Sequence, residues 1–153
     1  MMHIRPATES DVPGITALVR AAYEKWVPLI GREPLPMQAD YDEAVHDHMI
    51  DLLYDGDDLV GLIETIAHPD HLFIENVAVA PARQGEGFGR HLLAHAEGKA
   101  RAVHLFELRL LTNAAFATNV QLYRDIGYRI EREEAFLGGV AVHMHKALAD
   151  DAG

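Results

Sequence analysis

Apolar and polar positions along the chain recur with two periods, one typical of helices and the other of strands. A short strand is predicted at 2–8. Residues 8–27 then carry apolar side chains at helical spacing, on Val12, Ile15, Leu18, Val19 and Ala22. Residues 28–41 contain three of the seven prolines and a glycine, which predicts a structured loop. A second, more polar helix is expected from about 40 to 48.

Strand-like patterns dominate from residue 50 onward. Residues 50–67 predict a hairpin that turns at 55–57, and a second turn at 68–70 leads into a strand at 71–80. A helix at 89–102, a strand at 105–112, a helix at 114–126 and strands at 127–136 and 138–148 follow, and residues 150–153 are expected to fray. This order predicts one domain over 1–153, with an α/β (α+β) fold in which helices cover a mixed sheet.

Composition and charge narrow the range of partners. Of 153 residues, 49% are hydrophobic and 24% charged, as is typical of globular proteins. The absence of cysteine excludes disulfides, thiolate metal sites and a cysteine nucleophile. With 13 basic and 24 acidic residues the formal net charge is -11, so neither nucleic acid nor an anionic membrane is an expected partner. The chain shows neither a signal-peptide pattern nor an apolar run of roughly 20 residues, so a cytoplasmic protein is expected.

The stretch RQGEGFGRHLL, residues 83–93, places three glycines at alternate positions before a helix. Such a stretch can present bare backbone N–H groups to a phosphate. A dinucleotide-binding fold requires Gly-x-Gly-x-x-Gly, but counting from Gly85 brings Arg90 to the last position. A P-loop ends in Gly-Lys-Ser/Thr, and Gly-Arg-His stands there instead. Both of these phosphate-binding motifs are therefore excluded.

The pattern Gln84-x-x-Gly87-x-Gly89, between the strand ENVAVAP and an amphipathic helix, resembles the acetyl-CoA loop of the GNAT (GCN5-related N-acetyltransferase) superfamily. The resemblance continues in LLTNAAFATNVQLYRDIGY, which supplies Asn119, Tyr123 and Gly127-Tyr128 in the family's order. It covers essentially residues 2–148. It implies a GNAT fold with a mostly antiparallel sheet of about seven strands flanked by four helices, and an N-acetyltransferase that takes acetyl-CoA as acyl donor and needs no metal.

The resemblance also implies which residues bind acetyl-CoA. Backbone groups of Val77, Ala78 and Val79 would pair with the pantetheine arm, and an amide there would polarise the thioester carbonyl. Asn119 and Tyr123 would belong to the same site. The loop that holds the pyrophosphate would consist of Gln84, Gly85, Glu86, Gly87, Phe88, Gly89 and Arg90.

Tyr123 is the first candidate catalytic residue, because the resemblance places it near the CoA sulfur as a proton donor to the leaving thiolate. If cysteine stands in for the CoA thiol, its pKa of about 8.5 lies below the value of about 10 for tyrosine. Full proton transfer would then be uphill by roughly 2 kcal/mol, which favours hydrogen bonding to the thiolate. A purely packing role for the Tyr123 ring stays open.

Glu75 is the second candidate, as the base that deprotonates the acceptor. It interrupts the apolar strand LFIENVAVA, where a carboxylate needs a reason to be. However, in the histone-acetylating branch of the family the glutamate stands two residues farther from the loop, at the position that Phe73 occupies in this chain. A base acting through water and a mere ordering of the strand edge both stay open. Asn76, on the opposite face, is interpreted as structural.

The acceptor is expected to be a primary amine of a small molecule or peptide that attacks directly in a ternary complex, because no cysteine could carry the acyl group. The loop from Trp26 to Tyr41 lies where the family builds its acceptor pocket. The alternative function is a catalytically silent acyl-CoA-binding sensor or regulatory domain of the same fold. Turnover of acetyl-CoA across a panel of amines would distinguish the two.

Two further features bear on metal binding and on assembly: pairs of histidines and exposed edge strands. The pairs 46/48, 68/71 and 143/145 are close in sequence, but the last pair lacks a carboxylate at ligand spacing, and no metal site is predicted. Exposed edge strands near the C-terminal end make a homodimer reasonable.

Overall fold

The computed structural model of the protein describes residues 1–149, so the expected fraying of 150–153 lies outside the described residues. The strands are β1 (Met2–Pro6), β2 (Met49–Asp55), β3 (Asp58–Ala67), β4 (Leu72–Val79), β5 (Glu107–Asn113), β6 (Arg129–Phe136) and β7 (Gly139–Ala147). The α-helices are α1 (Val12–Tyr23), α2 (Val27–Ile30), α3 (Leu35–Gln38), α4 (Tyr41–Asp47), α5 (Phe88–Ala102) and α6 (Ala117–Asp125). Short 3-10 turns lie at η1 (Glu9–Asp11), η2 (Glu24–Trp26) and η3 (Pro81–Arg83).

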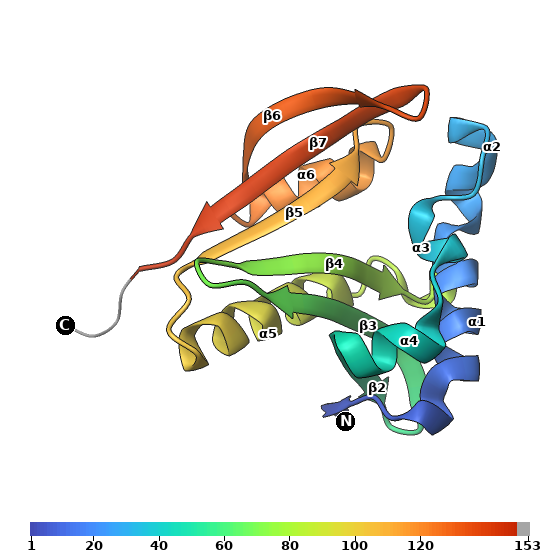
Figure 1. The fold of residues 1–153 in the computed structure, drawn as a ribbon. Helices are drawn as coiled ribbons and strands as arrows, with labels where there is room; N and C mark the ends of the chain where they lie inside the picture. Colours follow the sequence, from blue (N-terminus) through green and yellow to red (C-terminus); the bar gives the residue numbers. More distant parts are fainter. Residues whose placement is uncertain (150–153) are drawn as a thin grey trace. The chain divides into compact units, whose positions relative to one another are not determined.

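The strands form a seven-stranded sheet in the order β1-β2-β3-β4-β5-β7-β6. The pairs β1–β2, β2–β3, β5–β7 and β6–β7 are antiparallel, whereas β4 and β5 are parallel (Figure 1). Within residues 1–149, four α-helices have seven or more residues: α1, α4, α5 and α6. The predicted fold class, a mostly antiparallel sheet of about seven strands with flanking helices, is therefore confirmed.

Backbone contacts divide the chain into two compact units. The first consists of residues 1–65 and 76–93, and the second, within the described residues, of 66–75 and 94–149. The strand β4 and the helix α5 each contribute residues to both units. The single domain expected from the sequence stays a prediction.

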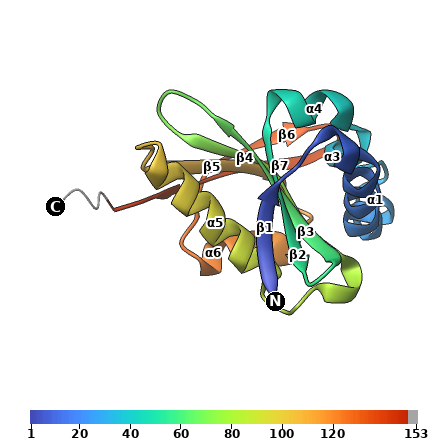
Figure 2. The same ribbon diagram turned by 90° about the horizontal axis from the view of Figure 1, so that it is seen from below.

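The core of the first unit lies between α1, α4 and one face of β2 and β3. Leu52 and Leu62 are paired across these strands and fully buried on this face. Leu53 and Gly61, also paired, belong to the opposite face, where the Leu92 side chain of α5 lies 3.0 Å from the Cβ position that Gly61 leaves empty. Figure 2 shows α1 and α4 on one side of β1–β3 and the start of α5 on the other.

The first predicted helix is broken into shorter pieces. Instead of one helix over 8–27, the structure has η1, α1, η2 and α2, and the last ends at Ile30, followed by Gly31 with φ of +75°. A left-handed residue ends a helix by turning its backbone away from the axis, and glycine adopts it without steric cost. The predicted structured loop at 28–41 contains the single-turn helices α2 and α3 and the start of α4.

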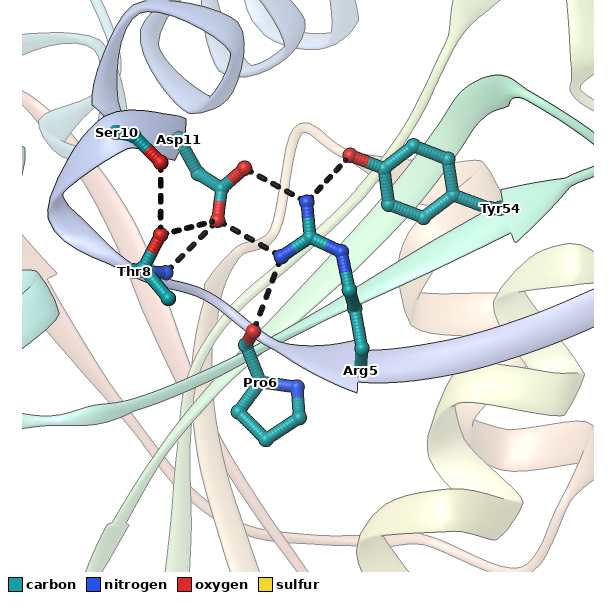
Figure 3. Close-up of polar contacts among 6 residues, drawn as sticks. All are labelled: Arg5, Pro6, Thr8, Ser10, Asp11 and Tyr54. Carbon is teal, nitrogen blue, oxygen red and sulfur yellow. Dashed lines mark hydrogen bonds and ion pairs between the residues drawn. The ribbon is translucent and has the colours of Figure 1, made fainter.

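A cluster of polar side chains joins β1 to the start of α1 (Figure 3). Arg5 donates two hydrogen bonds to the Asp11 carboxylate, at 2.9 and 2.8 Å, and a third to the Tyr54 hydroxyl on β2 at 3.0 Å. Asp11 also accepts a hydrogen bond from the backbone N–H of Thr8 at 2.8 Å. The hydrogen bonds from Arg5 hold the pKa of Asp11 well below its usual range, because they stabilise the ionised carboxylate.

The second unit is built on β5, β6 and β7, with α6 and the C-terminal part of α5. Leu108, Leu110 and Met144 are buried, and the last two face each other across the β5–β7 pair. An ion pair of 3.0 Å joins Lys146 of β7 to Glu97 of α5. Every residue of β6 is exposed, and β6 is an edge strand of the sheet. No helix among residues 1–149 is long and apolar enough to cross a membrane.

Candidate functional site

The glycine-rich loop between β4 and α5 has the backbone that an anion site requires. Gly85 and Gly87 have φ of +85° and +89°, and no atom lies within 4 Å of the Cβ position that either leaves empty. The His91 N–H donates to the Gly87 carbonyl at 3.1 Å, so α5 starts directly after this loop. A left-handed backbone costs roughly 1–2 kcal/mol for a residue with a side chain, which explains both glycines. The helix then directs its first N–H groups toward the loop.

The acidic side chain of the loop is neutralised within the loop itself. Arg83 donates from Nε to the Glu86 carboxylate at 3.0 Å and from Nη2 to Asp55 at 2.5 Å. The same guanidinium lies 5.1 Å from the centre of the Phe88 ring. The negative charge of Glu86 is therefore paired with the guanidinium of Arg83. Arg83 in turn is held by two carboxylates, so it is not poised to bind a phosphate.

Gln84 connects the loop to two neighbouring elements. Its Nε2 donates to the carbonyl of Val79, at the end of β4, at 3.2 Å. Its Oε1 accepts a hydrogen bond from the Lys25 ammonium, in η2, at 2.8 Å. These contacts fix the start of the loop against the strand that precedes it.

The backbone of β4 presents alternate residues to opposite edges of the strand. The Ala78 carbonyl lies 3.0 Å from the empty Cβ position of Gly61 in β3, and the N–H of Ala80 donates to Val60 in the same strand at 2.8 Å. Val77 and Val79 therefore direct their N–H and C=O groups to the edge away from β3. At this edge Tyr23 Oη donates to the Val77 carbonyl at 3.2 Å, just as Gln84 donates to Val79.

Asn76 has a more specific environment than the sequence indicated. It is buried, and its amide is hydrogen-bonded to the hydroxyls of Tyr23 at 2.7 Å and Tyr41 at 3.3 Å. These partners lie 53 and 35 residues away in the chain, so no local pattern reveals them. The only signal in the sequence is a polar amide within an apolar strand.

Glu75 is exposed on β4 and belongs to the second unit. Its side chain lies on the face that Phe73 and Val77 share, as the alternation of the strand predicts. The exposed position suits a carboxylate that contacts water. Its role as a base stays a prediction.

Asn119 and Tyr123 lie on α6, in the second unit. Asn119 is half-buried. Tyr123 is buried, with its ring 5.9 Å from that of Tyr128 in an edge-to-face arrangement. Burial raises the pKa of Tyr123 to about 12, because the phenolate loses its hydration.

Several of the histidines pair with single carboxylates. His48 contacts the buried Glu64 at 2.6 Å, and His71 contacts Asp70 at 2.6 Å. His143 is bonded to Glu134, from the strand beside it. In the part of the chain that the structure describes, no group of three or more His, Asp or Glu side chains could hold a metal ion.

Comparison with known proteins places this geometry in a family. The model of the acetyltransferase (GNAT) family matches residues 15–128, which is more than half of the chain. The chain therefore belongs to the GNAT acetyltransferase family, and the resemblance noted in its sequence is confirmed.

One relative and two solved structures illustrate the similarity. Amino-acid acetyltransferase from Neisseria meningitidis is 35% identical over 119 residues, which cover 74% of this chain but only 26% of that protein. The chain thus spans about a quarter of the length of this curated relative.

Among solved structures, PaiA N-acetyltransferase from Thermoplasma acidophilum, in complex with coenzyme A, superposes with a TM-score of 0.82 at 16% identity, over 96% of this chain and 99% of the other. The ribosomal-protein-S18-alanine N-acetyltransferase from Escherichia coli gives 0.75 at 21% identity, over 100% and 97%. At these identities the similarity shows the fold.

Proposed function

We propose that the protein is an N-acetyltransferase that transfers the acetyl group of acetyl-CoA to a primary amine of a small molecule or peptide. The observation that carries the proposal is the loop of Gln84–Arg90, with two open, left-handed glycines at the start of α5. Membership of the GNAT family and the coenzyme A complex of a protein with the same fold support it.

The loop would bind the pyrophosphate through its backbone. The residues from Gln84 to Arg90 offer successive N–H groups at a helix N-terminus, and the bare Gly85 and Gly87 let a phosphate approach. This mode of binding suits a chain with a net charge of -11, because it relies on local dipoles. The ion pair between Arg83 and Glu86 removes the repulsion that a carboxylate in the loop would otherwise cause.

The edge of β4 away from β3 would bind the pantetheine arm. Val77 and Val79 direct their N–H groups to this edge, and Ala78 lies between them. The Val77 N–H is the candidate donor to the thioester carbonyl, where negative charge develops as the amine attacks. One such donor is typically worth about a hundredfold to a thousandfold in kcat.

In the proposed reaction the amine nitrogen attacks the thioester carbon directly. A C–N bond forms and the C–S bond breaks. The amine proton passes to a base, and the CoA sulfur leaves as a thiolate that is then protonated. Glu75, an exposed carboxylate, would take the proton through water. No cysteine exists to carry an acyl-enzyme, which supports a ternary complex.

Tyr123 would hydrogen-bond to the thiolate and not protonate it. Its pKa of about 12 exceeds the value of about 8.5 for a thiol by 3.5 units, so full transfer would be uphill by about 5 kcal/mol. A hydrogen bond stabilises the developing negative charge without this cost. Asn119, four residues earlier on the same helix, would contact the CoA molecule from the same side.

Two measurements test the proposal. Isothermal titration with CoA should give a single site, and DTNB should detect thiol release from acetyl-CoA with at least one member of a panel of amino acids, polyamines and peptides. The curated relative acts on amino acids by its name, so these come first in the panel. CoA binding without thiol release for any amine would support the alternative, a silent acyl-CoA sensor. Absence of CoA binding would refute both.

A homodimer is the proposed assembly. The edge strand β6 carries charges that would complement a second antiparallel copy of itself. The strand carries Arg129 and Arg132 beside Glu131, Glu133 and Glu134, so pairing would bring basic and acidic side chains of the two copies together. Such pairing would also cover the backbone groups of an exposed strand edge.

A further inference from the structure

Asn76 is a buried amide whose hydrogen bonds come from outside its own strand. It is 3% exposed, its Oδ1 accepts from Tyr23 Oη at 2.7 Å, and its Nδ2 donates to Tyr41 Oη at 3.3 Å. A buried amide that loses its partners costs about 1–3 kcal/mol. The two tyrosines therefore make this polar residue possible in the middle of β4.

The hydrogen bonds continue beyond Asn76 in both directions. Tyr41 Oη, which accepts from Asn76, donates to the Pro36 carbonyl in α3 at 2.7 Å. Tyr23 Oη lies 2.7 Å from Asn76 Oδ1 and 3.2 Å from the Val77 carbonyl, so its single hydrogen is shared between two acceptors. A continuous chain of hydrogen bonds thus runs from α3 to the backbone of β4.

Val77 makes this chain relevant to the reaction. Its carbonyl and its N–H point to the same edge of β4, away from β3. The N–H is the proposed donor to the thioester carbonyl. A hydrogen bond that holds the carbonyl restricts rotation of the same residue's backbone and so helps to fix the direction of that donor.

The other end of this series of hydrogen bonds lies in the segment 28–41, part of the loop from Trp26 to Tyr41 that the family resemblance places on the acceptor side. This segment contains the single-turn helices α2 and α3, where the N–H of Gly31 donates to the Val27 carbonyl and the N–H of Met37 to the Pro34 carbonyl. The bond from Tyr41 to Pro36 holds its second half. One buried amide therefore connects the acceptor-side segment to the strand of the acyl donor.

We propose that Tyr23, Asn76 and Tyr41 are positioning residues for acyl transfer, which hold the Val77 backbone and the segment 28–41 in one mutual geometry. Their role rests on the proposed function. Misplacement of a reacting group by about 1 Å can cost about a hundredfold in rate. Loss of this series of hydrogen bonds should therefore lower kcat. The affinity for CoA, which is bound mainly by the glycine loop, should stay the same.

Tyr23→Phe tests this role, with Tyr54→Phe as the matched control. Both changes remove one hydroxyl within the first unit. The Tyr54 hydroxyl, however, accepts a hydrogen bond from Arg5 on β1 at 3.0 Å, so its removal affects a different pair of strands. For Tyr23→Phe we expect kcat in the DTNB assay to fall about tenfold to a hundredfold, with the Kd for CoA within about twofold of wild type. For Tyr54→Phe we expect kcat unchanged.

Hydrogen exchange of the free protein tests the connection without any acceptor. In Tyr41→Phe and in Asn76→Leu, the amides of α3 should exchange about fivefold faster, as expected for the loss of one hydrogen bond. Tyr54→Phe should leave them unchanged. This measurement does not depend on CoA or on turnover.

Each result decides between defined alternatives. A kcat for Tyr23→Phe within twofold of wild type would overturn the positioning role, and so would a decrease fully explained by weaker CoA binding. If the amides of α3 exchange at the wild-type rate in both Tyr41→Phe and Asn76→Leu, the series of hydrogen bonds does not hold the segment 28–41. If wild type binds CoA but releases no thiol with any amine, the transferase itself is refuted and the positioning role with it, whatever the exchange data show.

Discussion

The hydrogen-bonded pair of Arg5 and Asp11 allows a quantitative prediction about stability. Asp11→Asn keeps the size of the side chain and one oxygen that can still accept from the Thr8 N–H, but it removes the charge. In the folded protein the carboxylate is bound bidentately at 2.9 and 2.8 Å and its side chain is 14% exposed, whereas the Arg5 side chain is 40% exposed. Charge-assisted bonds are stronger than neutral ones, but solvent around Arg5 screens the pair.

We therefore expect Asp11→Asn to lower the free energy of unfolding by about 1–2 kcal/mol at pH 7. For a chain of this length the melting temperature should fall by about 2–8 °C. Glu33→Gln is the control, because the Arg20–Glu33 pair is single, 3.3 Å long and exposed on both sides. That change should cost less than about 0.5 kcal/mol. Differential scanning calorimetry measures both variants.

The pH dependence gives an independent check. The pKa of Asp11 is lowered in the folded protein, so the carboxylate contributes stability above its unfolded value of about 3.9 and loses this contribution as the pH falls toward the folded value. The difference in the free energy of unfolding between wild type and Asp11→Asn should therefore be constant from about pH 5 to 7 and shrink below about pH 4. The reasoning would be refuted if Asp11→Asn were as stable as Glu33→Gln at pH 7. It would also be refuted if the difference in stability between wild type and Asp11→Asn grew in acid.

Five further predictions concern the proposed site and assembly. Gly87→Ala should weaken CoA binding about tenfold in calorimetry, because its φ of +89° is strained for alanine, whereas Gly98→Ala, within α5, should bind CoA like wild type. Tyr123→Phe should lower kcat about tenfold to a thousandfold; an unchanged kcat would remove this residue from the mechanism. With a pKa of about 12, Tyr123 should also produce no break in the wild-type kcat–pH profile below about pH 11. Glu75→Gln should remove the acidic limb of that profile if Glu75 is the base, and a limb that persists would assign another one. Wild type should elute as a dimer in light-scattering chromatography and Arg132→Glu as a monomer, and a monomeric wild type would contradict pairing along β6.

Local periodicity was sufficient to predict most of the fold. Ile15, Leu18, Val19 and Ala22, placed on one face by helical spacing, are buried in α1. Phe88, Leu92, Leu93 and Ala96, which helical spacing also places on one face, are buried in α5, because burial of one stripe is the main reason an amphipathic helix forms. The sequence did not show that the first helix ends at Tyr23, since 3-10 turns and short helices continue the same local conformation beyond it.

The sequence by itself also determined the chemistry of the loop. Gly85 and Gly87 can adopt positive φ wherever the chain places them, and the order of the motifs from Gln84 to Tyr128 indicated the family. Only the tertiary structure decided what the polar side chains contact. Arg83 binds Asp55 and Glu86, and Asn76 binds two tyrosines from distant helices. Backbone conformation depends on a residue and its neighbours, whereas a side-chain hydrogen bond depends on which distant segments the folded chain brings within 3 Å.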